Sequence, residues 1–139
     1  MFNTQGLSLS TESDEGIVVS AYQEQIDTDE CTGSLWGYCL RIENNSSQKI
    51  RLLKKNLCIT DNNGQSIFNS SYGFHGEIPD LEAGECFEYE DTMRINAAEA
   101  ILYGTCVACT EDGNEFEIKL PLVSMQISSK QNRSLMHFN

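Results

Sequence analysis

Apolar side chains that recur at every second position constrain this sequence more than any other feature. Between positions 36 and 42 the large apolar residues Trp36, Tyr38, Leu40 and Ile42 alternate with other side chains, among them Arg41. Successive side chains of a β-strand point to opposite faces of its sheet, so this spacing predicts a strand with one face in the core. We therefore expect a sheet with one buried face.

The same kind of segment recurs along the chain. Further strands are predicted at 87–95 and 116–122, and also at 17–25, 50–61, 66–69 and 101–110. The alternation slips between Ile50 and Ile59, which predicts a β-bulge or burial on both faces there. The Asn-Gly pair at 63–64 and the Asp-Gly pair at 112–113 are typical of tight hairpins. About seven short strands without an amphipathic helix predict an all-β, immunoglobulin-like sandwich of two sheets.

The length of the chain leaves room for one domain. We expect the sandwich to occupy residues 15–126 of the 139, with a flexible N-terminal segment at 1–14 and a polar C-terminal tail at 127–139. The first residues carry Asp and Glu in place of the basic and apolar regions of a signal peptide. No window approaches the ~20 apolar residues of a membrane-spanning helix. These features predict a cytoplasmic protein.

The charge balance narrows the class of partner. Nine Lys and Arg face 21 Asp and Glu, which gives a formal net charge of −12. A field of this sign repels phosphate backbones and anionic lipids, so neither nucleic acid nor a membrane is an expected partner. Solubility alone is the commonest explanation of such a balance, and a partner, if selected by this charge, would be a basic patch on another protein or a divalent cation.

Six cysteines define the redox expectation: Cys31, Cys39, Cys58, Cys86, Cys106 and Cys109. In a reducing cytoplasm they remain thiols. Cys106 and Cys109 have the spacing of a zinc knuckle or a redox pair. On a strand, however, positions i and i+3 face opposite sides of the sheet, and no second such pair is present. We therefore interpret the two residues as structural.

The order of several motifs resembles the ApaG family over residues 15–125. The segments that carry the resemblance are Gly16–Val19, Tyr38–Asn44, Ile59–Asp61 with Gly64, Gly73–Pro79, Gly84–Tyr89 and Phe116–Pro121. The resemblance implies a fibronectin-like β-sandwich without enzymatic activity. It also implies a link to cobalt resistance and magnesium efflux, known for the bacterial proteins, or to protein binding, as in the eukaryotic domains.

Two departures mark this chain as a divergent member. Ser71 occupies the first glycine position of the family's GxGxxG run, of which Gly73, Gly76 and the following Pro79 remain. The segment 55–57 is Lys-Asn-Leu where the family has Arg-His-Trp. The family's glycine loop is therefore degenerate here.

The glycine loop is the candidate binding site. Its residues are Tyr72, Gly73, Phe74, His75, Gly76, Glu77 and Pro79. Adjacent aromatic residues on a loop held by a rigid scaffold are typical of a binding surface. In the alternative interpretation, Phe74 and Ile78 turn inward and plug one end of the sandwich.

The sequence favours nucleotide binding and metal binding by this loop less than protein binding. Glycine backbones can approach a nucleotide or pyrophosphate, but such a site needs a helix directly after the glycines. His75, Glu77, Asp80 and Glu82 offer ligands to a divalent metal from one loop, although a solvated acidic loop is the more usual reading. We predict no metal site and no cofactor.

Catalytic machinery is not expected. The histidines are His75 and His137, and neither is accompanied by a serine or cysteine nucleophile motif. The carboxylates Glu88 and Glu90 fall on the exposed face of a predicted strand, where both stay hydrated and nothing adapts them to acid–base catalysis. The sequence therefore predicts a non-enzymatic binding domain with a protein partner, and it leaves the oligomeric state open.

Overall fold

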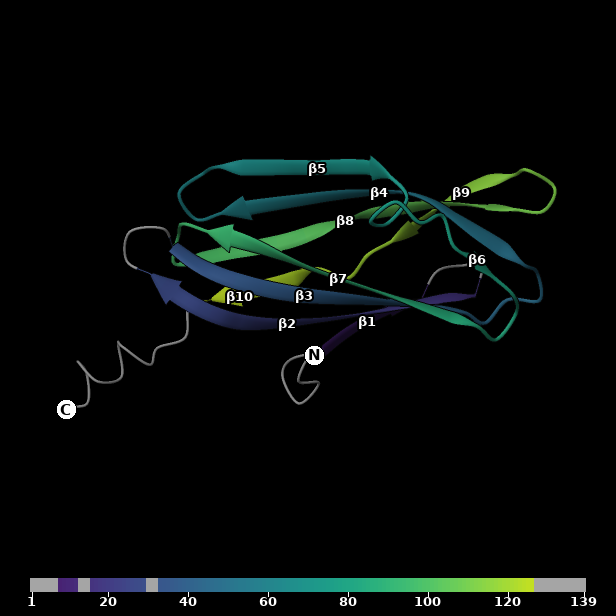
Figure 1. The fold of residues 1–139 in the computed structure, drawn as a ribbon, viewed down its shortest axis with the longest axis horizontal. Coiled ribbons are helices and arrows are strands. Elements are labelled where there is room, and N and C mark those ends of the chain that lie inside the picture. The colour runs from purple at the N-terminus through teal and green to yellow at the C-terminus, as the bar shows by residue number, and fades with distance from the viewer. Residues whose placement is uncertain (1–7, 13–15, 30–32, 127–139) are drawn as a thin grey trace.

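The computed structural model describes residues 8–12, 16–29 and 33–126, which form ten strands in two antiparallel sheets. The first sheet has the order β1-β2-β3-β7, and the second has the order β10-β8-β4-β5, with β6 beside β4 and β9 beside β8. The two sheets lie as layers, with β4, β5 and β8 in one and β2, β3 and β7 in the other (Figure 1). The predicted all-β sandwich is confirmed.

The strands have the following bounds. The first sheet contains β1 (Ser8–Glu12), β2 (Ile17–Asp29), β3 (Gly33–Asn44) and β7 (Cys86–Ile95). The second contains β4 (Ile50–Asp61), β5 (Ser66–Tyr72), β6 (Asp80–Leu81), β8 (Glu99–Thr110), β9 (Glu115–Lys119) and β10 (Val123–Gln126). None of the described residues lies in a helix, so this part of the chain has no helix that could cross a membrane.

The core lies between the two sheets. The alternating residues of β3 that predicted the first strand, Trp36, Tyr38, Leu40 and Ile42, are all buried. They belong to one cluster with apolar side chains from the second sheet: Ile50, Leu52, Leu57, Ile59, Leu102, Ile118 and Met125. The central β3 strand pairs with β2 on one side and β7 on the other, which explains why its pattern is the clearest in the sequence.

Two predictions about strand boundaries need correction. The N-terminal segment 1–14 was expected to lie outside the sandwich, but Ser8–Glu12 forms β1 and pairs with β2. The expected strand 116–122 ends at Lys119, and Leu122 is half exposed before β10 begins. Pro121 cannot donate a ladder hydrogen bond, which accounts for the break. The C-terminal tail 127–139 lies outside the described residues.

The predicted irregularity in 50–61 is a β-bulge. The pairing of β4 with β8 shifts register between Leu52 and Lys54, so Leu53 has no partner on β8. An extra residue of this kind moves the following side chains to the other face of the sheet. Lys55 and Leu57 are consequently buried, and Lys54 and Asn56 are less so. The bulge also frees the Leu53 carbonyl for the loop described below.

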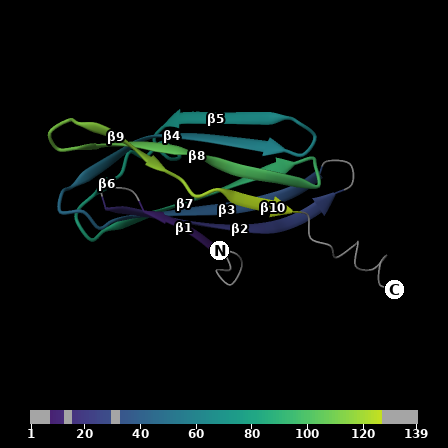
Figure 2. The ribbon, with the colours of Figure 1, turned by 180° about the vertical axis from the view of Figure 1, so that it is seen from behind.

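The two sides of the sandwich close in different ways. On one side β10 lies close to β2, where Gln23 Nε2 donates a hydrogen bond to the Ser124 carbonyl at 3.2 Å. On the other side β7 and β5 are the end strands of their sheets, and both views show β5 at the rim of the molecule (Figures 1 and 2). The segment between β5 and β6 contains the candidate binding loop.

Candidate functional site

The candidate loop is built on a tight turn over residues 74–77. The Phe74 amide donates to the Glu77 carbonyl at 2.7 Å, and the Glu77 amide donates to the Phe74 carbonyl at 3.0 Å. The two central residues, His75 and Gly76, have positive φ values of 53° and 84°. Two successive left-handed residues define a type I′ turn. Glycine adopts the positive φ of such a turn freely, and histidine and asparagine adopt it more readily than most other residues. The degenerate glycine run is therefore a hairpin turn.

Backbone hydrogen bonds attach this turn to the second sheet. The Gly73 amide donates to the bulged Leu53 carbonyl at 2.6 Å, and the Leu52 amide donates to the Pro79 carbonyl at 2.9 Å. Gly73 has a φ of 74°, and a Cβ placed there would lie 2.6 Å from the Glu77 carbonyl oxygen. Glycine is required at this position by both conformation and space.

Aromatic contacts attach the same turn to the first sheet. Phe74 is buried, and its ring lies edge-on to those of Phe87 and Tyr89 at centroid distances of 5.4 and 5.3 Å. The His75 ring lies 4.7 Å from the Tyr89 ring, and its Nε2 is 3.1 Å from the Glu90 carbonyl oxygen. With its proton on Nε2, His75 donates to that carbonyl. The turn is thus held by both sheets.

A polar cluster that the sequence did not reveal lies beneath the turn. Lys55 is only 4% exposed, and its ammonium lies 5.2 Å from the centre of the Tyr89 ring. The Tyr89 hydroxyl donates to Asp91 Oδ2 at 2.9 Å. Burial raises the pKa of both Tyr38 and Tyr89 well above the ordinary value of 10. These groups stay in their neutral forms at physiological pH, and the Lys55 stem packs with the core while its charge faces an aromatic ring.

The two apolar loop residues divide between the two alternatives, so neither holds for both. Phe74 turns inward with 1% of its surface exposed, whereas Ile78 remains 49% exposed. Of the other candidate residues, Tyr72, His75, Gly76 and Glu77 are exposed, Pro79 is half-buried and Gly73 is buried. The exposed surface of the loop is therefore formed by Tyr72, His75, Glu77 and Ile78.

The loop does not have the arrangement of a phosphate cradle. The amides of Gly73, Phe74 and Glu77 donate within the protein, to Leu53, Glu77 and Phe74 respectively. The glycines lead through Pro79 into strand β6 rather than into a helix. A dinucleotide loop directs such amides and a helix N-terminus at its ligand.

The residues that the sequence offered as the less favoured metal or redox candidates do not form a cluster. Cys106 is fully buried, Cys109 lies on the opposite face of β8, and burial raises the pKa of the Cys106 thiol to about 12. Asp80 pairs with Arg51, and Glu82 lies 3.8 Å from Lys49. Among the described residues no group of three or more His, Cys, Asp or Glu side chains is placed to hold a metal ion.

The cysteines of the described residues are free thiols, as the sequence predicted. Cys39, Cys58, Cys86, Cys106 and Cys109 are free. Burial raises the pKa of Cys39 to about 11. Cys31 lies outside the described residues.

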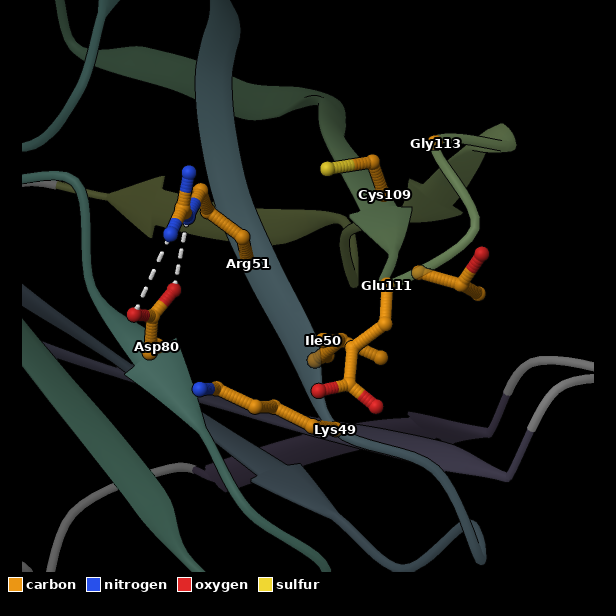
Figure 3. Close-up of a pocket in the computed structure, with 8 residues that line it drawn as sticks. Lys49, Ile50, Arg51, Asp80, Cys109, Glu111 and Gly113 are labelled. Carbon is orange, nitrogen blue, oxygen red and sulfur yellow. Dashed lines mark hydrogen bonds and ion pairs between the residues drawn. The ribbon is translucent and has the colours of Figure 1, made fainter.

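A pocket of about 360 Å³ lies beside the end of the loop (Figure 3). Arg51 Nε donates to Asp80 Oδ1 at 2.7 Å across it, and this guanidinium lowers the pKa of the Asp80 carboxyl. Lys49, Cys109 and Glu111 also line the pocket. Its cations therefore stand next to carboxylates, so it does not offer the concentrated positive charge that an anionic ligand requires. The ion pair fastens β6 to β4 just after the loop.

Sequence comparison places this architecture among known proteins. The family model described as ApaG domain matches residues 24–108, more than half of the chain. A protein named ApaG from Rhizobium leguminosarum bv. trifolii is 30% identical over 115 residues, covering 83% of this chain and 88% of that protein. A protein of the same name from Allorhizobium ampelinum is 34% identical over 102 residues, covering 73% and 78%.

Solved structures agree at the level of the fold. A putative ApaA protein from Bordetella pertussis superposes with a TM-score of 0.77 at 22% identity, covering 84% of this chain and 97% of that one. The structural genomics target SoR45 gives a TM-score of 0.79 at 22% identity, covering 86% and 92%. With a matching family model and relatives of this identity and coverage, the chain belongs to the ApaG domain family.

Proposed function

We propose that this chain is a non-enzymatic protein-binding domain of the cytoplasm, and that the turn at 74–77 is its contact surface. The observation that carries the proposal is the attachment of this turn to both sheets, through Gly73 and Pro79 on one side and Phe74 and His75 on the other. A loop that is already ordered loses little conformational entropy when it binds. Its exposed Tyr72, His75, Glu77 and Ile78 are thus preorganised for a partner.

The charge around the turn supports a basic partner. Glu77 on the turn and Glu88 and Glu90 on β7 are exposed, in a chain of net charge −12. Complementary charge across an interface increases the association rate and excludes partners of the wrong sign. We infer a partner surface with Lys or Arg around an apolar centre that receives Ile78 and Tyr72.

The absence of catalysis is part of the proposal. His75, the histidine of the described residues, contacts an aromatic ring and a backbone carbonyl, which are positioning contacts rather than activation of a nucleophile. The family resemblance connects such chains to cobalt and magnesium homeostasis. We assign that connection to a protein partner of this domain, with direct binding of the ion as the alternative.

A charge reversal at the turn tests the proposal. Glu77→Lys is compared with Glu111→Lys, since both residues are exposed in turns and both changes alter the net charge equally. We expect Glu77→Lys to reduce the quantitative capture of partners from the native cell at least tenfold, while Glu111→Lys leaves it near wild type. Equal capture by both variants at unchanged melting temperature would contradict the turn as the contact surface.

Calorimetric titration tests the alternative. Micromolar binding of cobalt or magnesium by the wild-type chain, lost in a His75→Ala and Glu77→Gln double variant, would replace the protein-partner proposal with direct metal binding. We expect no such binding.

A further inference from the structure

Strand β5 is an unprotected edge of the second sheet. It pairs with β4 on one side, and within the part of the chain that the structure describes no other strand pairs with it. Both views show β5 as the outermost strand of its layer (Figures 1 and 2). Six of its seven residues are exposed, including Ile67, Phe68 and Tyr72 at 56%, 77% and 75%. The first sheet does not reach far enough to cover it.

The sequence of β5 lacks the usual protection of an edge. The strand reads SIFNSSY and contains no charged residue and no proline. Natural sheets discourage pairing at free edges with charges, prolines, bulges or very short strands. A seven-residue, neutral, partly apolar edge is therefore a template for another strand.

The hydrogen-bonding phase shows which backbone groups this edge presents. The Asp61 amide donates to the Gln65 carbonyl at 2.9 Å at one end of the pairing with β4. The Gly73 amide donates to the Leu53 carbonyl at 2.6 Å at the other end. Bonded and non-bonded pairs alternate in an antiparallel ladder, so residues 67, 69 and 71 point their amides and carbonyls at β4. The outward groups belong to Ser66, Phe68, Ser70 and Tyr72.

We propose that β5 pairs antiparallel with β5 of a second copy of this chain, joining the second sheets of two copies into one continuous sheet. A two-fold axis through Asn69 sets Phe68 opposite Ser70 of the other copy and Ser66 opposite Tyr72 of the other copy. This register uses the outward amides and carbonyls of all four edge residues on both copies. No other two-fold register about the strand uses all four.

Charge and side-chain chemistry favour a second copy over an unrelated strand. Every side-chain pair that this register creates is neutral, so the strand brings no charge of its own into the contact of two chains that each carry −12. Phe68 and Tyr72 lie on one face of the strand and become diagonal neighbours across the axis. Diagonal positions are about 7–8 Å apart, within reach of aromatic side chains. The same edge thus complements itself.

This inference goes beyond the proposed function and rests mainly on the backbone of another element. The proposed contact surface is the turn at 74–77 with the flanking Tyr72 and Ile78, whereas pairing uses the backbone edge of β5 at 66–72, so Tyr72 is the one residue that both share. Glu77→Lys leaves the β5 edge intact, and changes at Ser70 leave the turn intact. The experiments can therefore reject partner binding by the turn without rejecting β5 pairing, and the reverse.

Site-directed crosslinking tests the register. At a non-hydrogen-bonded antiparallel pair the Cα atoms lie about 4.5 Å apart, a separation that a disulfide can bridge. In a Cys86→Ser background, we expect Asn69→Cys to form disulfide-linked dimers under mild oxidation. Ile67→Cys and Ser71→Cys should each stay monomeric alone and crosslink when mixed, because each faces the other across the axis.

Sedimentation or light scattering tests the pairing without crosslinks. We expect wild type to dimerise with rising concentration and Ser70→Pro to remain monomeric, because the Ser70 amide points away from β4 and proline removes only the outward donor. The matched Ser70→Ala keeps that donor and should dimerise like wild type. Added salt should not weaken the dimer, since the shared strand is neutral. A wild-type chain that stays monomeric at all concentrations, or a dimer unaffected by Ser70→Pro, would overturn the proposal, even if β5 captured another protein.

Discussion

The outer strands β5 and β7 lie on the same side of the sandwich, yet they differ in whether the outward backbone groups of their free edges have hydrogen-bond partners. The Asn44 amide donates to the Glu85 carbonyl at 2.9 Å, so the even-numbered residues of β7 point their backbone groups outward. Two of those groups are already occupied. The Glu90 carbonyl accepts from His75, and the Thr92 amide donates to Asp91 Oδ1 at 2.8 Å.

The side chains reinforce this difference. The outward residues of β7 include Glu88, Glu90 and Arg94, and Glu88 pairs with Arg41 at 2.9 Å. Strand β5 carries no charge, and no hydrogen bond from another described segment reaches its outward backbone groups. The binding loop therefore leaves the β5 edge, crosses the gap between the sheets and protects the β7 edge. We infer that one edge is closed for stability and the other is left open for association.

Removal of the Phe74 side chain should give the largest effect, because this ring fixes the loop over β7. We expect Phe74→Ala to lower the free energy of unfolding by about 3–5 kcal/mol. The control is Tyr72→Ala, which truncates an aromatic residue exposed on β5 and should cost under about 0.5 kcal/mol. Denaturant titration measures both. Similar losses in the two variants would remove the distinction between the two edges.

A methyl group at Gly73 should have the next largest effect. Gly73→Ala combines a left-handed backbone with a contact of 2.6 Å to the Glu77 carbonyl oxygen, and we expect a loss of about 2–3 kcal/mol. Gly76→Ala provides the control, since its φ is also positive, at 84°, but nothing lies within 4 Å of an added Cβ. We expect about 1 kcal/mol there. Equal losses would show that the positive φ alone, and not the close approach of the Glu77 carbonyl, explains why glycine is needed at position 73.

Alkaline pH should weaken the β7 side through buried phenols. Burial raises the pKa of Tyr38 and Tyr89 above the ordinary value of 10, so above that pH the unfolded chain releases protons that the folded chain retains. The contribution of the phenols to stability is full below pH 10 and falls as pH rises, by at most about 1.4 kcal/mol per pH unit for each phenol. Thiols contribute from pH 9, because burial raises the pKa of Cys106 to about 12. Tyr89→Phe should have a shallower slope above pH 10 than wild type, and an unchanged slope would contradict this account.

Adding a charge to the β5 edge and removing one from the β7 edge should change the free energy of unfolding least. The change on β5 should affect association most. Phe68→Lys places a charge on β5 at an exposed site and should alter the free energy of unfolding by under about 0.5 kcal/mol. We expect it to abolish dimerisation measured by sedimentation. The opposite change, Glu90→Ser on β7, removes an edge charge but leaves the His75 contact with the Glu90 carbonyl. It should therefore not create a second association surface, and new oligomers in that variant would show that charge alone protects β7.

The strands were predictable where one face is buried along the whole element. Trp36, Tyr38, Leu40 and Ile42 read as a strand because β3 is central and covered by the second sheet. The exposure of β5 on both faces was not predictable in the same way. Alternation reports which side chains share a face, but it does not report how far the opposite sheet extends.

The candidate site was recognisable in the sequence as a glycine loop, but its turn and its orientation were not. Gly73 and Gly76 marked the loop, and both have positive φ values. The inward direction of Phe74 depends on Phe87 and Tyr89, which are distant in sequence. Lys55 was missed because the bulge at Leu53 reverses the faces of β4, and local spacing does not show where such a shift falls.

Residue-resolved amide exchange is the most direct test of the contrast between the two edges. In dilute solution the amides of Ile67, Asn69 and Ser71 should be protected by β4, and those of Phe68 and Ser70 should exchange freely. At high protein concentration the account predicts that Phe68 and Ser70 become protected as well, with the exposed amides of β7 unchanged. Protection of Phe68 and Ser70 at every concentration, or at none, would contradict an open β5 edge that pairs with its own copy.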